Sequence, residues 1–388
     1  MIDFDRIIDR TGTSSVKYDV RKAIFGSDDV IPLWVADMDF AAPKAVTDAL
    51  VQRASHPIYG YTVYPDSLFR AMQDWFEYRH NWSIDKKSIL ICPGVVPSMY
   101  AVIKALSDVG DSIIVQPPIY PPFFSAVSDT GRKIVENPLK LTNGEYHIDL
   151  DHLEQCAATG AKILLFCSPH NPVGRVWKKQ ELEAVVDIAR RYQLIILSDE
   201  IHADLIYPQY RHTPLATLAE DVTIITAVSP SKTFNIPGLG LSSLVINDRK
   251  HWQAIRQVFD CLHINAINPF SVTAFEVAYR EGEQWLNELM LYLDDTCQQV
   301  TDLFQQHSSN IKIISPQGTY LLWFDCRALK LSDEQLKSLF IKEAKVGLNP
   351  GISFGQLGSG FMRMNIAAPR KIIIEACQSI IRCCDGRR

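Results

Sequence analysis

The sequence has no apolar run near the roughly 20 residues that a transmembrane helix needs, and its first ten residues, MIDFDRIIDR, are charged where a signal peptide is apolar. Its 39 basic and 44 acidic residues are mixed along the chain, which leaves no basic stripe to neutralise a nucleic-acid backbone. We therefore expect a soluble, cytoplasmic protein that binds neither membranes nor nucleic acid.

None of the nine cysteines belongs to a CxxC pair or stands at a His–Cys spacing that suits a metal. Cys383 and Cys384 are adjacent in the sequence, and a disulfide between neighbours would be strained. We expect reduced thiols and no metal site.

Internal repeats, low-complexity stretches and long linkers are also missing, so domains have to be recognised by pattern. The 388 residues, 47% of them hydrophobic, are enough for one large core and a smaller lobe. Between residues 85 and 250, short runs that are apolar on both faces alternate with amphipathic stretches such as 179–192. The runs span 89–91, 113–115, 163–167, 194–197, 222–226 and 241–246. This alternation predicts an α/β fold with a mostly parallel sheet sandwiched by helices.

The chain beyond about residue 275 has a different pattern. Helical stretches are followed by two predicted strands of alternating character, 312–315 and 320–325, and by a final helix. We expect a large domain over residues 46–275 and a smaller α+β domain built from residues 1–45 and 276–388.

Turn and polar residues follow several predicted strands, at 93–94, 117–118, 168–174, 198–200 and 229–232. Open α/β sheets bind their ligands at the carboxyl ends of the strands, so these segments are candidates for one site.

Two of these segments contain ionisable groups. Lys232 is preceded by Ser229 and Ser231, which could place its amine beside a bound phosphate; read alone, a solvated loop lysine is the simpler interpretation. Asp199 ends an apolar run, where a carboxylate could keep a pyridine nitrogen protonated, and His202 could reach a ring hydroxyl. The alternative is that Asp199 caps a helix.

A third segment places Asn171 before Pro172 and Gly174, which favours a turn and could point the amide at a ligand oxygen; an ordinary turn is the alternative. Late in the chain, Arg363 has apolar neighbours and offers a two-pronged donor for a substrate carboxylate. A structural ion pair is the alternative for Arg363.

In order and approximate spacing, Asn171, Asp199, Lys232 and Arg363 resemble the signature of the class I/II aminotransferases, which bind pyridoxal 5′-phosphate (PLP). The resemblance runs essentially from end to end and is nearest to the MalY/PatB-type cystathionine β-lyases, which are C–S lyases. The segments that carry the subgroup resemblance are 34–40 (WVADMDF), 60–62 (GYT), 93–96 (PGVV), 168–172 (SPHNP), 199–202 (DEIH) and 231–237 (SKTFNIP).

The resemblance implies catalytic roles for three residues. Lys232 would form the Schiff base with PLP, Asp199 would bind the pyridine nitrogen, and Tyr120 would stack on the ring. Asn171 would lie near the ring hydroxyl and the substrate, whose carboxylate Arg363 would bind.

Phosphate contacts are expected from Val95 and Val96, at a helix N-terminus, beside Ser229 and Ser231. Tyr61 resembles the tyrosine that reaches the phosphate of the neighbouring subunit, which implies an obligatory homodimer.

The sequence departs from the common pattern at two positions. Gly240 stands where most aminotransferases of this type have a phosphate-binding arginine, and His202 stands where tyrosine is more frequent. The C–S lyase subgroup also lacks that arginine, so Gly240 favours a lyase. The alternatives are an aminotransferase acting on aromatic or sulfur amino acids, and a PLP-binding regulator that acts through a protein partner.

The expected reaction is removal of the substrate Cα proton by the Lys232 amine, followed by loss of a thiolate from Cβ. L-Cystathionine would give homocysteine, and L-cysteine would give sulfide, each with pyruvate and ammonia. For this role the site has to lower the lysine pKa from about 10.4 by burial or nearby positive charge. Trp34, Tyr320 and Phe354 are candidates for the pocket wall, with core packing as the alternative.

Overall fold

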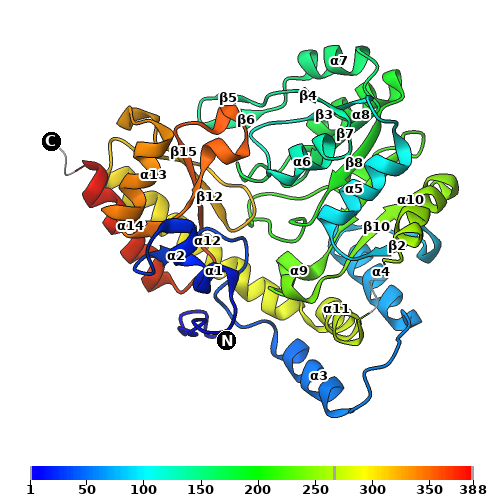
Figure 1. Ribbon diagram of the computed structural model, residues 1–388, viewed down its shortest axis with the longest axis horizontal. Coiled ribbons are helices and arrows are strands. Elements are labelled where there is room, and N and C mark those ends of the chain that lie inside the picture. Colours follow the sequence, from blue (N-terminus) through cyan, green and yellow to red (C-terminus); the bar gives the residue numbers. More distant parts are fainter. Residues whose placement is uncertain (1, 265–267, 386–388) are drawn as a thin grey trace.

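A seven-stranded sheet forms the centre of the computed structural model, which describes residues 2–264 and 268–385 (Figure 1). Its strands follow the order β2-β10-β9-β8-β7-β3-β4, and neighbouring strands are parallel except at β10, which runs antiparallel to both β2 and β9. The bounds are β2 Ile89–Cys92, β3 Ser112–Val115, β4 Lys133–Glu136, β7 Ile163–Cys167, β8 Ile195–Asp199, β9 Ile224–Val228 and β10 Ser242–Ile246. The mostly parallel sheet is therefore confirmed, and each of the six predicted runs forms a strand.

Both faces of this sheet are buried, which explains why its strands read as continuous apolar runs. In β7, Ile163 and Leu165 pack on one side with α5 (Val95–Leu106), α6 (Pro122–Ser128) and α10 (Arg249–Cys261). Leu164 and Phe166 face the other side and pack with α7 (Leu150–Ala158) and α8 (Lys179–Tyr192). The helices thus cover the sheet on both faces, as predicted (Figure 1).

A second, antiparallel sheet has the order β11-β12-β15-β14, with β11 Lys312–Ile314, β12 Leu321–Asp325, β14 Asn349–Pro350 and β15 Phe361–Asn365. The predicted alternation in the second of its strands is wrong, because the first four residues of β12 are all buried. Leu322 and Phe324 contribute to one hydrophobic core, whereas Trp323 points into another.

The N-terminal segment packs with the C-terminal part of the chain, which contains the second sheet. β1 (Ile31–Pro32) pairs in parallel with β13 (Val346–Gly347), and the short helices α1 and α2 appear on the same side of the molecule as α13 and α14 (Figure 1). The division of the chain near residues 45 and 275 stays a prediction. The remaining elements are α1 Val16–Asp19, α2 Arg21–Phe25, α3 Lys44–Ser55, α4 Asp66–His80, β5 Lys140–Thr142, β6 Glu145–His147, α9 Pro230–Thr233, α11 Pro269–Glu281, α12 Glu283–His307, α13 Asp333–Lys342 and α14 Arg370–Asp385.

Within residues 2–264 and 268–385, no helix is both long and apolar enough to cross a membrane, and no group of His, Cys, Asp and Glu side chains is placed to hold a metal ion.

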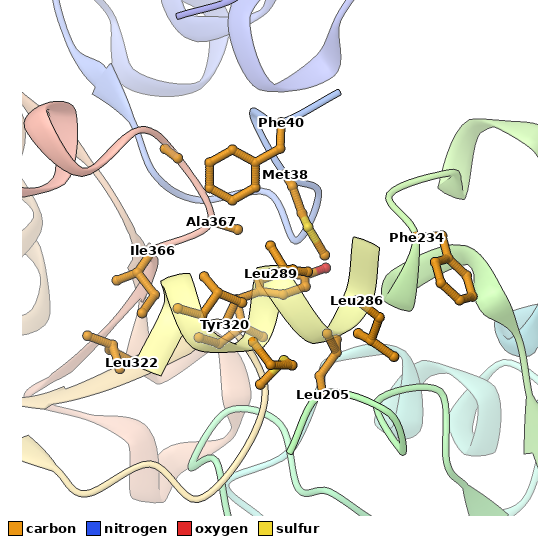
Figure 2. Close-up of a cluster of buried hydrophobic side chains, with 14 of the residues drawn as sticks. Met38, Phe40, Leu205, Phe234, Leu286, Leu289, Tyr320, Leu322, Ile366 and Ala367 are labelled. Carbon is orange, nitrogen blue, oxygen red and sulfur yellow. The ribbon is translucent and has the colours of Figure 1, made fainter. Parts of the chain in front are cut away.

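Helix α12 is the centre of the largest core. Leu286 and Leu289 of α12 are fully buried and lie beside Met38 and Phe40 from the N-terminal segment and Tyr320 from the chain before β12 (Figure 2). The helix therefore ties both ends of the chain to the central part of the fold.

Truncating Leu289 to alanine should lower the free energy of unfolding by about 2 to 5 kcal/mol, because it leaves a cavity in this core. Denaturant unfolding of Leu289→Ala beside Leu291→Ala, whose side chain is 65% exposed, measures the difference. Equal losses in the two variants would contradict the packing described for α12.

Candidate active site

A cavity of about 460 Å³ lies where β7, β8 and β9 end, between the central sheet and β15. All of the predicted site residues except Tyr61 line it: Val95, Val96, Tyr120, Asn171, Asp199, His202, Ser229, Ser231, Lys232 and Arg363. Parallel pairing explains much of this, since it aligns Asp199 with Cys167 on one side and Ala227 on the other. The carboxyl ends of the strands thus deliver their following segments to one place.

Lys232 lies in the short helix α9, directly after β9. Ser229 caps this helix, because its hydroxyl accepts a hydrogen bond from the Ser231 amide at 3.1 Å. The Lys232 amine donates to the backbone carbonyl of Ala36 at 2.7 Å. Burial and the nearby Arg363 charge lower the Lys232 pKa to about 8. The interpretation of Lys232 as a solvated loop lysine is therefore wrong. Its lowered pKa is what removal of a substrate Cα proton by the amine requires.

Asp199 is the last residue of β8, and only 6% of its surface is exposed. One carboxylate oxygen accepts a hydrogen bond from the Ile201 amide at 3.1 Å. The segment that follows is a turn, so the helix-cap alternative is wrong, although the bond is of the capping kind. Burial raises the Asp199 pKa to about 7. A cationic partner beside Asp199 in the cavity would lower this pKa and so ionise the carboxyl group.

His202 follows in the same turn and is 3% exposed. Burial, together with the charges of Lys232 and Arg363, lowers its pKa to about 3, so the imidazole is neutral at physiological pH. Within the described part of the chain, its Nδ1 atom has no hydrogen-bond partner. This buried atom is available to a polar group of a ligand.

Arg363 lies on β15 and is 4% exposed. It donates to the side-chain oxygens of Asn171 at 2.9 Å and Asn349 at 2.8 Å, and to the carbonyl of Trp34 at 3.1 Å, and it stacks on Phe354. None of the described acidic side chains forms an ion pair with it, so the structural ion-pair alternative is wrong. Burial lowers its pKa to about 10, and an anionic ligand would relieve this cost.

The end of the cavity that is suited to a phosphate contains backbone amides and hydroxyls. Val95 and Val96 begin α5, whose first-turn amides have no partners within the helix. The Ser229 and Ser231 hydroxyls lie 2.9 Å apart in the same cavity. Gly240 also lines it, with a left-handed backbone (φ 53°) that suits glycine.

The remaining predicted residues separate into three groups. Trp34 and Tyr120 line the cavity, and burial raises the Tyr120 pKa. Tyr320 and Phe354 are buried behind the wall, where Phe354 supports Arg363 and the Tyr320 hydroxyl donates to the Ala36 carbonyl at 2.9 Å. Tyr61 is fully exposed and lies outside the cavity of its own chain.

Sequence reasoning missed two residues that hold the site cations. Asn349 binds Arg363, and the carbonyl of Ala36 binds Lys232. The conspicuous segment WVADMDF could have drawn attention to Ala36, but its contribution is a backbone atom, which no side-chain pattern reports.

The raised pKa of Asp199 predicts that Asp199→Asn makes the cofactor-free protein more stable. The folded state keeps the Asp199 proton up to about pH 7, whereas the unfolded chain releases it near pH 4. The wild-type protein therefore loses stability relative to the variant as the pH rises from 4 to 7. We expect a gain on the order of 1 kcal/mol or more at pH 8, and a smaller one at pH 5.

Denaturant unfolding at both pH values measures this gain. Glu220→Gln, at an exposed position, is the matched control, because it also replaces one carboxyl group by an amide. If Asp199→Asn is no more stable than wild type at pH 8, the ionised Asp199 carboxylate does not destabilise the folded protein, and the prediction is wrong.

Comparison with known proteins identifies the fold and the cofactor. The model of the family "Aminotransferase class I and II" matches residues 28–380. Cystathionine beta-lyase PatB of Bacillus subtilis is 38% identical over 94% of this chain and 95% of its own length, and protein MalY of Escherichia coli is 31% identical over 98% of each. The PLP-bound C-S lyase from Staphylococcus hominis, complexed with the inhibitor L-cycloserine, is 31% identical, with a TM-score of 0.93 over 99% of this chain and 98% of that one.

The cavity's groups suit PLP: a lysine amine of lowered pKa, a buried carboxyl group, an unpartnered histidine nitrogen and a helix N-terminus. These matches confirm the predicted resemblance, the α/β fold and the PLP cofactor. The chain belongs to the class I and II aminotransferase family.

Proposed function

We propose that this protein is a PLP-dependent C–S β-lyase that splits L-cystathionine, L-cysteine or a related cysteine thioether into a thiol, pyruvate and ammonia. The observation that carries the proposal is the meeting of Lys232, Asp199 and Arg363 in one cavity, with no counter-ion for Arg363 among the described residues. The names of PatB, a cystathionine beta-lyase, and of the Staphylococcus hominis C-S lyase support the same reaction.

The cofactor would lie between Lys232 and Asp199. Lys232 would bind it covalently, Asp199 would pair with its ring nitrogen, and Tyr120 would cover one ring face. The α5 amides would bind its phosphate, together with the hydroxyls of Ser229 and Ser231. When bound, PLP supplies an electron sink for the bond that breaks at the substrate Cα.

The protein's own groups would bind the substrate and move its proton. Arg363 would exchange the Trp34 carbonyl or an asparagine oxygen for the substrate carboxylate, which is a stronger acceptor. The Lys232 amine, with a pKa of about 8, is substantially neutral at mildly alkaline pH and can accept the Cα proton. The thiolate then leaves from Cβ, and hydrolysis of the remaining enamine gives pyruvate and ammonia.

Pyruvate release tests the reaction. We expect the PLP-loaded protein to form pyruvate from L-cystathionine without any added keto acid, and Lys232→Ala to lose nearly all turnover because it lacks the base and the covalent attachment. An obligatory requirement for a keto acid would contradict the lyase and support the aminotransferase alternative. PLP binding without turnover of any cysteine thioether would support the regulator.

We also propose that the working unit is a homodimer in the cytoplasm. Exposed apolar side chains cluster in and after α3, at Val51, Ile58, Tyr59, Tyr61 and Val63, and a surface hollow between α3 and α11 lies beside them. A second copy of the chain would cover this surface. Tyr61 would then reach the end of the second copy's cavity that is suited to a phosphate. Free thiols, including those of Cys92, Cys167 and Cys377, suit a reducing compartment.

Subunit complementation tests this arrangement. Tyr61→Phe and Lys232→Ala should each lower the pyruvate production of a dimer in which both subunits carry the change. In a mixed dimer of the two variants, one cavity has both wild-type residues if Tyr61 acts across the interface. Co-expression should therefore restore a substantial part of the wild-type pyruvate production. Activity no higher than the mean of the two separate variants would show that Tyr61 does not act on the partner's site.

A further inference from the structure

The segment of residues 34–38 has no helix or strand, yet each of its five carbonyls accepts a side-chain hydrogen bond. Two of them contact the site cations: the Trp34 carbonyl accepts from Arg363 at 3.1 Å, and the Ala36 carbonyl accepts from Lys232 at 2.7 Å. The positions of both cations therefore depend on where this irregular segment lies.

A cluster of four charged side chains holds the segment from behind. Lys17 pairs with Asp39 at 2.8 Å, and Arg10 pairs with Asp39 at 2.7 Å and with Asp37 at 2.8 Å. The two cations also donate to the segment's backbone, Lys17 to the Asp37 carbonyl and Arg10 to the Met38 carbonyl, both at 3.3 Å. The cluster thus binds the carbonyls that directly follow the one that Lys232 uses.

Burial of the two innermost charges in this cluster is costly. Lys17 is fully buried and Asp39 is 4% exposed, so the desolvation of both charges offsets much of their attraction. Apolar side chains of the same size could pack there at least as favourably. Unlike apolar side chains, however, the four charges impose direction, since each donor and acceptor fixes one point of the backbone.

We propose that Arg10, Lys17, Asp37 and Asp39 are positioning residues, which hold residues 34–38 so that the Trp34 and Ala36 carbonyls meet Arg363 and Lys232. The proposal rests on the proposed function, in which Lys232 binds PLP and removes the proton. Asp37 also acts on Lys232 through its charge, which opposes the lowering of the lysine pKa. Asn365 and Asn235 hold the same segment from other elements and complete its fixation.

The test compares Lys17→Met with the conservative Lys17→Arg. Phe304→Leu is the control for general loss of stability, because Phe304 is buried against Phe324 near the far end of α12. The readouts are the Kd of PLP for the cofactor-free protein, kcat and KM for L-cystathionine, and the melting temperature. Arg10→Gln, which keeps the Lys17–Asp39 pair, replaces Lys17→Met if that variant does not fold.

We expect Lys17→Met to raise the PLP Kd and to lower kcat, each on the order of tenfold, and Lys17→Arg to recover most of both. Phe304→Leu should lower the melting temperature without changing the PLP Kd. A Lys17→Met protein that melts earlier but binds PLP and turns over like wild type would overturn the proposal. The Kd is independent of the reaction catalysed, so it tests the positioning role even if the lyase assignment fails.

Discussion

Charge balance inside the cavity is the constraint on which the rest of this structure depends. Lys232 and Arg363 share the cavity with one carboxyl group, Asp199, and burial shifts the pKa of each group toward its neutral form. Neither cation has a close carboxylate partner among the described residues, and both donate instead to neutral oxygens of the protein. Neutral oxygens bind a cation more weakly than an anionic ligand does, so an anionic ligand in the cavity would displace them.

The fold meets this constraint by bringing together segments that are far apart in the sequence. The parallel strands β8 and β9 deliver Asp199 and Lys232 to the same edge of the central sheet, while β15 of the second sheet delivers Arg363. The irregular segment 34–38 runs between the two parts and supplies carbonyls to both cations. Helix α12 packs beneath this segment, so the core supports the geometry of the site (Figure 2).

Much of this could be predicted where a local pattern reflects burial. The strands of the central sheet were recognisable because they are apolar on both faces, and 179–192 matched α8 because its apolar residues recur at helical spacing. β4 was missed because it lies at the sheet edge and is largely exposed, so it has no apolar run. The alternation expected for 320–325 failed because both faces of β12 are covered, by different cores.

The site divides in the same way. Residues such as Asp199 and Lys232 were predictable because each follows a buried strand, where ligands of such sheets bind. The Ala36 carbonyl and Asn349 were not, since one is a backbone atom and the other reaches Arg363 only through the long-range pairing of β14 with β15. Likewise, the ion cluster behind the segment joins residues that the sequence separates by up to 29 positions.

A crystal structure of the protein grown with PLP tests the central claim most directly. The account predicts that the Lys232 nitrogen is bonded to the cofactor's aldehyde carbon, and that an Asp199 oxygen lies within hydrogen-bond distance of the ring nitrogen. A cofactor bound elsewhere, or one whose ring nitrogen lies out of reach of Asp199, would contradict it.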